Sequence, residues 1–130
     1  MSSTVSLTDL QLAIVRILWE RGESTVLEVQ EALAPERRLA QTTVATILTR
    51  LEKRRIVKHQ NKGRLFVYKA LVTEPQVRRS MVSDLTELLF DGSPAALISH
   101  LLSEKEIDPR DLDEVKRMIA DAERTGTNAG

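Results

Sequence analysis

The sequence predicts a mainly α-helical protein in which three helices and a two-stranded hairpin come first and three more helices follow. Hydrophobic residues recur every three or four positions along most of the 130 residues, which is the helical period. Only between residues 56 and 69 do they alternate one by one, as they do in strands. The composition, 42% hydrophobic and 29% charged, is that of a folded protein, and the length fits one domain or a small domain with an appendage.

The first two helices are each marked by a capping pair. Thr8 and the glutamine three residues later have the spacing of a capping box, and Gly22 provides a left-handed stop. Thr25 and the glutamate three residues later open a shorter helix, which Pro35 closes because the residue before a proline disfavours the helical conformation. The apolar sides of these helices are expected to comprise Leu10, Ile14, Ile17, Leu18, Val26, Val29 and Leu33.

A third helix and a hairpin complete the first part of the chain. The helix is predicted over residues 41–54, and its buried side is expected to comprise Val44, Ile47, Leu48 and Leu51. Residues 56–60 and 64–69 are predicted as strands, joined by residues 61–63, whose Asn-Lys-Gly composition is typical of hairpin turns. Three helices followed by such a hairpin are typical of a winged helix-turn-helix domain, which we place at residues 1–73.

Three further helices follow that domain. The first of them ends near Gly92, the second starts at Pro94 and the third starts at Pro109. We expect a helical region over residues 74–124 and a flexible tail over 125–130. These helices carry more apolar side chains than so small a first domain can cover, which predicts dimerisation with a second copy. The expected dimer contacts are Val77, Met81, Leu85, Leu88, Leu89, Leu97, Leu101, Leu112, Val115 and Ile119.

Positive charge is concentrated in one segment of a chain that is formally neutral. Residues 37–69 hold ten basic residues and one acidic residue, Glu52, so the rest of the chain carries the compensating negative charge. A segment of one sign attracts a polyanion whatever the net charge of the whole protein. Because this segment is also the predicted helix and hairpin, double-stranded DNA is the leading candidate partner.

The outer side of the third helix has the composition of a surface that reads bases. Opposite the apolar stripe lie small hydroxyls and cations, and Glu52 projects nearer the core edge. Such a surface fits the major groove, where threonine offers a hydroxyl and a methyl group and arginine reaches guanine. A solvated face is the plainer interpretation, but solvated faces usually mix charge signs. The candidate base-reading residues are Thr42, Thr43, Ala45, Thr46, Thr49 and Arg50.

Other residues are assigned to phosphate contacts, to the core or to the hairpin surface. Cations at the end of the third helix and on the hairpin would set the register on DNA. The candidate phosphate contacts are Lys53, Arg54, Arg55, Lys58, Lys62 and Arg64. Trp19, Phe66 and Tyr68 are expected in the core. His59 is expected on the hairpin, and His100 is expected to be partly buried or interfacial.

Several classes of function find no support in the sequence. There is no cysteine, which excludes a disulfide framework and thiolate metal sites, and two histidines make a zinc or iron site improbable. We expect no metal and no cofactor. No catalytic triad, phosphate-binding glycine loop or metal-ligand spacing is present, so an enzyme is the least supported class. The start lacks the order of a signal peptide and no apolar run could span a bilayer, so a cytoplasmic protein without membrane insertion is expected.

At these residues the chain resembles the penicillinase and methicillin-resistance repressor family, the BlaI/MecI type of winged-helix regulators. The resemblance lies in residues 7–11 with Leu18-Trp19, in the T-x-x-T-x-x-T-R-L string of residues 43–51, and in Phe66-Val67-Tyr68. It extends over nearly the whole chain. It implies a homodimeric repressor on a palindromic operator, with the C-terminal helices as the dimer interface. Some relatives carry basic side chains where this chain has Thr42 and Ala45.

The resemblance also implies a route of induction. Family members are usually inactivated by a membrane-bound sensor metalloprotease that cleaves in the fifth helix, and the corresponding bond here is His100–Leu101. A copper-responsive branch uses a cysteine-rich hook, which a chain without cysteine cannot form. Two other interpretations stay open at this stage. One is a winged-helix regulator that responds to a small molecule, and the other is a winged-helix module that binds an acidic protein.

Overall fold

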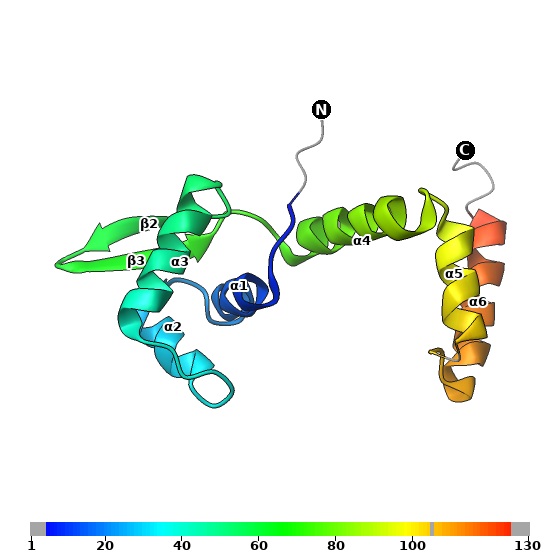
Figure 1. Ribbon diagram of the computed structural model, residues 1–130, viewed down its shortest axis with the longest axis horizontal. Helices are drawn as coiled ribbons and strands as arrows, with labels where there is room; N and C mark the ends of the chain where they lie inside the picture. Colours follow the sequence, from blue (N-terminus) through cyan, green and yellow to red (C-terminus); the bar gives the residue numbers. More distant parts are fainter. Residues whose placement is uncertain (1–4, 105, 126–130) are drawn as a thin grey trace. The chain divides into compact units, whose positions relative to one another are not determined.

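The computed structural model describes residues 5–104 and 106–125 (Figure 1). The described residues up to Asp84 form one compact unit and those from Leu85 onward form a second. The first unit therefore includes the N-terminal part of α4, beyond residue 73. In chain order the elements are α1 Asp9–Arg21, β1 Ser24–Thr25, α2 Val26–Leu33, α3 Gln41–Lys53, β2 Val57–Lys62, β3 Leu65–Ala70, α4 Glu74–Phe90, α5 Pro94–Ser103 and α6 Pro109–Thr125.

The capping boxes predicted for α1 and α2 are confirmed. The Thr8 hydroxyl accepts from the Gln11 backbone N–H at 3.1 Å, and the Gln11 side chain accepts from the Thr8 N–H at 2.9 Å. The same reciprocal pair forms at Thr25. A third box opens α4, where Thr73 exchanges hydrogen bonds with the residue three positions later. The sequence pattern was not interpreted as a capping box at this position.

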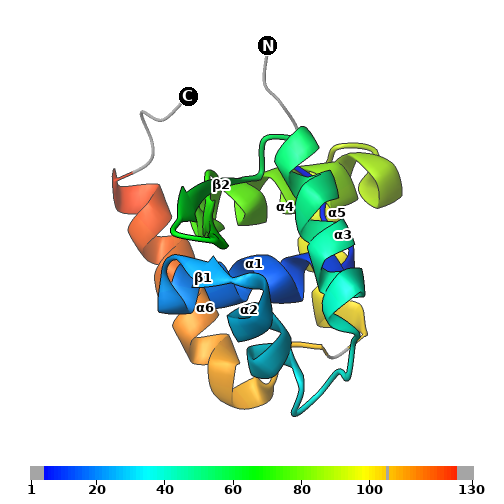
Figure 2. The ribbon, with the colours of Figure 1, turned by 90° about the vertical axis from the view of Figure 1, so that its left-hand side faces the viewer.

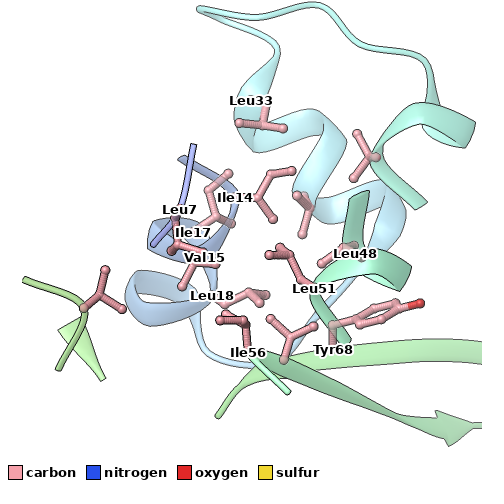
Figure 3. Close-up of a cluster of buried hydrophobic side chains, with 14 residues drawn as sticks. Leu7, Ile14, Val15, Ile17, Leu18, Leu33, Leu48, Leu51, Ile56 and Tyr68 are labelled. Carbon is pink, nitrogen blue, oxygen red and sulfur yellow. The ribbon is translucent and has the colours of Figure 1, made fainter. Parts of the chain in front are cut away.

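The core of the first unit is built from α1, α2, α3 and the hairpin. Ile14, Val15, Val29, Leu48 and Leu51 have no exposed surface, and Figure 3 shows Leu48 and Leu51 of α3 facing side chains of α1. The expected apolar stripes therefore form one hydrophobic cluster. The other buried side chains of that cluster are Leu7, Ile17, Leu18, Leu33, Val44, Ile56, Val57, Tyr68 and Val77.

The expected packing of Trp19 is confirmed, with an added polar contact. Its ring lies against the core cluster, and its indole Nε1–H donates to the Val72 carbonyl oxygen at 2.8 Å. A tryptophan that buries its ring needs a partner for this N–H. The bond ties the segment after the hairpin to α1 and so helps fix where α4 begins.

The sheet has three strands in the order β1-β3-β2, whereas the sequence predicted two. Ser24 pairs with Tyr68 and Thr25 with Val67, so β1 adds to the hairpin as an edge strand. A strand of two residues is too short to show alternation, which is why the pattern did not reveal it. Figure 1 shows the β2–β3 hairpin extending away from the helices.

The hairpin turn starts two residues later and ends one residue later than predicted. Lys62 pairs with Leu65, so the two turn residues are Gly63 and Arg64, and Asn61 belongs to β2. Of the two turn residues, Gly63 has a positive φ, 66°, which a glycine at the first central position of a type II′ turn requires. The prediction of a turn over residues 61–63 located the glycine but not the register.

The end of α3 carries a backbone strain. The Arg55 N–H donates to the Glu52 carbonyl at 2.9 Å and the Ile56 N–H to the Leu51 carbonyl at 2.9 Å, which is the Schellman pattern. That pattern puts Arg55 in the left-handed conformation, with φ 64°. Glycine is the usual residue at this position, because a side chain there costs about 1–2 kcal/mol.

Replacing Arg55→Gly is therefore expected to raise the free energy of unfolding by about 0.5–1 kcal/mol, since relief of strain exceeds the added entropy of the unfolded chain. Urea unfolding measures the change. Lys53→Gly, inside the last helical turn, is the matched control and should lower stability by about 1 kcal/mol. If both substitutions destabilised the protein equally, the strain at Arg55 would not exist.

The second unit consists of the end of α4 together with α5 and α6. The Ser93 hydroxyl accepts from the Ala96 N–H at 3.1 Å and caps α5, and the Asp108 carboxylate accepts from the Arg110 N–H at 2.8 Å at the start of α6. No described residue of α5 or α6 is fully buried. Large apolar side chains of this unit are well exposed, namely Leu85, Leu88, Leu89, Ile98, Leu102, Met118 and Ile119.

His100 is exposed and not partly buried. Its side chain has 46% of its surface accessible, its ring lies 5.6 Å from the ring of Phe90, and its Nε2 lies 3.8 Å from a Glu106 carboxylate oxygen. The expectation of partial burial is wrong for the single chain, because Phe90 and Glu106 leave almost half of the side chain accessible. Whether a second subunit covers it stays a prediction.

Candidate nucleic-acid interface

The outer side of α3 faces solvent over its whole length. The side chains that the sequence assigns to base reading are exposed, apart from Ala45, which is half-buried. In Figure 2, α3 runs across the side turned to the viewer, and no other helix or strand lies in front of it. The opposite side of the helix supplies Val44, Leu48 and Leu51 to the core. The outer side of α3 is therefore not buried by other described parts of the protein.

Two threonine hydroxyls on this surface already donate hydrogen bonds within α3. The Thr46 hydroxyl donates to the Thr42 carbonyl oxygen at 2.9 Å, and the Thr49 hydroxyl donates to the Ala45 carbonyl oxygen at 2.9 Å. Each oxygen keeps a lone pair that can accept from an amino group of adenine or cytosine, and each methyl group can contact thymine. In this state the surface combines acceptors and methyl groups, and Arg50 adds a donor.

Four of the six candidate phosphate contacts are exposed and unpaired. Within residues 5–104 and 106–125, none of their side chains makes an ion pair or hydrogen bond with the protein. These are Lys53, Arg55, Lys58 and Arg64. Two of them lie at the end of α3 and two lie on the hairpin. A DNA phosphate backbone that passes α3 could therefore contact cations of both elements.

The other two cations have partners inside the protein. The Arg54 guanidinium donates to the Ser6 carbonyl oxygen at 2.7 Å and to the Gln11 side chain at 3.5 Å, so it also anchors the segment before α1. Lys62 Nζ lies 2.9 Å from a Glu23 carboxylate oxygen. The hydrogen bond and the charge of Lys62 lower the pKa of Glu23. Neither contact could be read from the sequence, because both link segments far apart in the chain.

Phe66 is not a core residue. Its side chain is 49% exposed, whereas Tyr68, two positions along the same face of β3, is 3% exposed. The prediction is confirmed for Tyr68 and wrong for Phe66, because Phe66 lies closer to the turn than the helices reach. Its ring stacks on His59 instead, with ring centroids 4.1 Å apart and planes 18° apart.

Tyr68 links the core to the outer side of α3. Burial raises the pKa of its hydroxyl, the negative charge of Glu52 raises it further, and a hydrogen bond with Thr49 opposes the shift. The phenol therefore stays protonated at neutral pH. Thr49, a candidate base-reading residue, and Glu52, the one acid of residues 37–69, both interact with Tyr68 of the hairpin.

Metal clusters and membrane-spanning helices are not found among residues 5–104 and 106–125. Within those ranges, no three His, Cys, Asp or Glu side chains lie where they could hold a metal ion together. None of the described helices combines the length and the hydropathy needed to cross a bilayer.

Comparisons with known proteins agree with the resemblance seen in the sequence. The model of the family described as penicillinase repressor matches residues 7–121. The transcriptional regulator BlaI of Mycobacterium tuberculosis is 34% identical over 125 residues, which cover 95% of this chain and 89% of the relative. A penicillinase repressor of Staphylococcus aureus is 18% identical over 108 residues, which cover 83% of this chain and 86% of the relative.

Solved structures of similar fold cover between 58% and 89% of this chain. The DNA-binding domain of a BlaI repressor has a TM-score of 0.51 at 26% identity and covers 58% of this chain and 93% of its own. Bacillus licheniformis BlaI, solved as a monomeric form with the blaP half-operator, has a TM-score of 0.50 at 26% identity and the same coverage. A MarR family protein of Bacillus stearothermophilus, at 18% identity and a TM-score of 0.50, shares the fold alone.

Proposed function

This chain belongs to the penicillinase repressor family, and we propose that it acts as a homodimer on a palindromic operator. Family membership makes it a DNA-binding transcriptional repressor and not an enzyme. The observation that carries the proposal is the exposed outer side of α3, which bears hydroxyls, methyl groups and Arg50 and no carboxylate. A protein of similar fold was solved with a half-operator, which supports the same use of this unit.

In the proposed complex, α3 of each subunit lies in a major groove and the hairpin reaches the neighbouring backbone. Thr42, Thr46 and Arg50 would contact base edges, and the unpaired cations would contact phosphates. Two such helices bind half-sites whose centres are about 34 Å apart, or a multiple of that distance, because the grooves must face the same side of the duplex.

Dimerisation is assigned to exposed and half-buried apolar side chains of α4, α5 and α6. A contiguous apolar surface in water usually marks an interaction site. Val77 is only 2% exposed and packs in the core of the first unit, so its side chain is not free for a partner and we leave it out of the contact set. The remaining proposed contacts are Met81, Leu85, Leu88, Leu89, Leu97, Leu101, Leu112, Val115 and Ile119.

Induction by a membrane-bound sensor metalloprotease would cleave His100–Leu101, near the C-terminal end of α5. Cleavage of a helix requires local unfolding, which costs little where few side chains are buried, and α5 has no fully buried residue in its described length. Loss of the chain beyond the cut would remove α6 and the last three residues of α5. Each half-site would then be bound by a separate subunit, and the gain from simultaneous binding would vanish.

The salt dependence of binding tests this proposal. If each subunit neutralises ~4–5 phosphates, the logarithm of affinity should fall against the logarithm of salt concentration with a slope of about −7 to −9 for the dimer. Fluorescence anisotropy with a duplex selected from a random-sequence library gives the slope. A salt-insensitive complex would contradict the phosphate contacts. Absence of any DNA binding at low salt would favour a protein-binding module, and a thermal shift with a small ligand at unchanged chain mass would favour a ligand-responsive regulator.

A further inference from the structure

Glu52 is the one acid in the basic segment, and it lies where a carboxylate should oppose DNA binding. It stands in the last turn of α3, between the exposed cations Arg50 and Lys53 in the chain. An uncompensated negative charge near a phosphate backbone weakens association. Its side chain, however, is turned toward the hairpin and is 31% exposed.

The Glu52 carboxylate binds two groups of one residue on β2. Its Oε1 and Oε2 lie 2.7 and 2.9 Å from His59 Nδ1, and Oε2 also accepts from the His59 backbone N–H at 3.3 Å. A carboxylate only accepts hydrogen bonds, so Nδ1 carries the proton whether the ring is neutral or charged. One side chain of α3 therefore holds both the backbone and the ring of a strand residue.

The His59 ring is held from a second side by β3. Phe66 stacks on its face at 4.1 Å, and the Tyr68 ring lies 5.4 Å away at a tilt. The His59 side chain is 30% exposed, so water competes with its hydrogen bond to Glu52 less than it does at an open surface. Three elements, α3, β2 and β3, thus meet at one imidazole.

We propose that Glu52 and His59 are positioning residues that brace the hairpin against α3, so that the hairpin cations meet phosphates while α3 lies in the groove. The proposal rests on the DNA-binding function above. The brace sets the direction of the hairpin that carries Lys58, Lys62 and Arg64. Without it, the hairpin keeps the packing of Tyr68 and the contacts of Gln60 and Lys62 with Glu23, but it loses the hydrogen bonds between Glu52 and β2 that hold its cations relative to α3.

Two substitutions at Glu52 distinguish the effect of its contacts with His59 from the effect of its negative charge. Glu52→Ala removes both the charge and the contacts, whereas Glu52→Gln removes the charge and keeps an oxygen that can accept from His59. We expect Glu52→Ala to bind the selected duplex ~5–10-fold more weakly, with a salt slope smaller by about two for the dimer because each subunit loses about one phosphate contact. Glu52→Gln should bind at least as tightly as the wild type. Equal affinities of the two variants would overturn the proposal.

A second pair of substitutions, at His59 on β2, tests the same contact. His59→Asn and His59→Ala both remove the ring that stacks on Phe66, but the asparagine amide can donate to Glu52 from nearly the position of Nδ1. We expect His59→Asn to keep most of the affinity and slope, and His59→Ala to lose both. Thermal unfolding of all four variants identifies any that do not fold. The proposal is then tested with the Glu52 pair or the His59 pair, whichever has two folded members.

The control for charge alone is Glu23→Gln. This substitution also removes one acid beside the hairpin, but it releases Lys62 and breaks no contact between α3 and the strands. It should bind more tightly than the wild type, the opposite of Glu52→Ala. If the wild type itself binds no duplex, the proposed function fails. If the wild type binds and Glu52→Ala binds equally well or better, only the brace fails.

Discussion

Leu88→Asp is expected to convert the dimer into monomers and to lower affinity for the selected duplex ~100-fold or more at nanomolar protein, because a monomer binds one half-site without its partner. Leu88 is 81% exposed in the single chain, so an aspartate there leaves the folded subunit unchanged. Within a dimer interface the same carboxylate would be buried without a partner, which costs several kcal/mol. Sedimentation velocity measures the assembly, and anisotropy measures the binding.

Leu27→Asp is the matched control for this substitution. Leu27 is 48% exposed on α2, in the first unit and outside the proposed contact set. That variant should remain a dimer and bind normally. A Leu88→Asp variant that sediments like the wild type would move the interface to another surface, and dissociation of both variants would show a general effect of the added charge.

Arg50→Ala is expected to cost about 1–3 kcal/mol of binding free energy, which is ~5–150-fold in affinity, and to relax the preference at one base pair. Arg50 is exposed on the outer side of α3. A guanidinium that reaches a guanine edge makes a bidentate contact that no other base provides. Binding of single-base variants of the selected duplex shows which position loses its discrimination.

Lys62→Ala provides the contrast, because a phosphate contact does not depend on sequence. It should weaken operator and random duplexes alike and lower the salt slope by about one for each subunit. Its effect on affinity should be smaller than that of Arg50→Ala, since the free protein already pairs Lys62 with Glu23 at 2.9 Å. If both variants lost the same affinity on both kinds of DNA, the division between base-reading and phosphate-contacting residues would be wrong.

Local signals in the sequence were sufficient to predict the helices of the first unit and their buried sides. A capping box involves residues three apart, and an apolar stripe repeats every turn, so both are visible in one segment of the chain. Val44, Leu48 and Leu51 are buried as that period requires. The exposed outer side of α3 follows from the same geometry, because a helix that buries one stripe must expose the other.

Contacts between distant segments could not be predicted in this way. The pairing of β1 with β3, the hydrogen bonds of Arg54 to the segment before α1 and the pairing of Lys62 with Glu23 each join residues far apart in sequence. Phe66 was misassigned for a related reason. Alternation shows which face of a strand a residue is on, but not how far along the strand the core extends.

Glu52 shows how an exception to a pattern can mark a contact. The sequence showed one acid among ten bases and placed it near the core edge, but no local rule indicated that its partner is His59. The apolar sides of α5 and α6 are a second case. Their period predicts helices with more apolar side chains than the chain can cover, and the structure shows that none of the described residues of α5 and α6 is buried in the single chain.

Disulfide cross-linking from α3 tests most directly whether its outer side enters the major groove. The natural chain has no cysteine, so Thr46→Cys introduces a single thiol on that side of the helix. We expect this variant to cross-link to a selected duplex that carries a thiol tethered in the major groove of a half-site, and Leu27→Cys, on α2, to leave the duplex free. Binding of the duplex by both variants without any cross-link from Thr46→Cys would contradict the account.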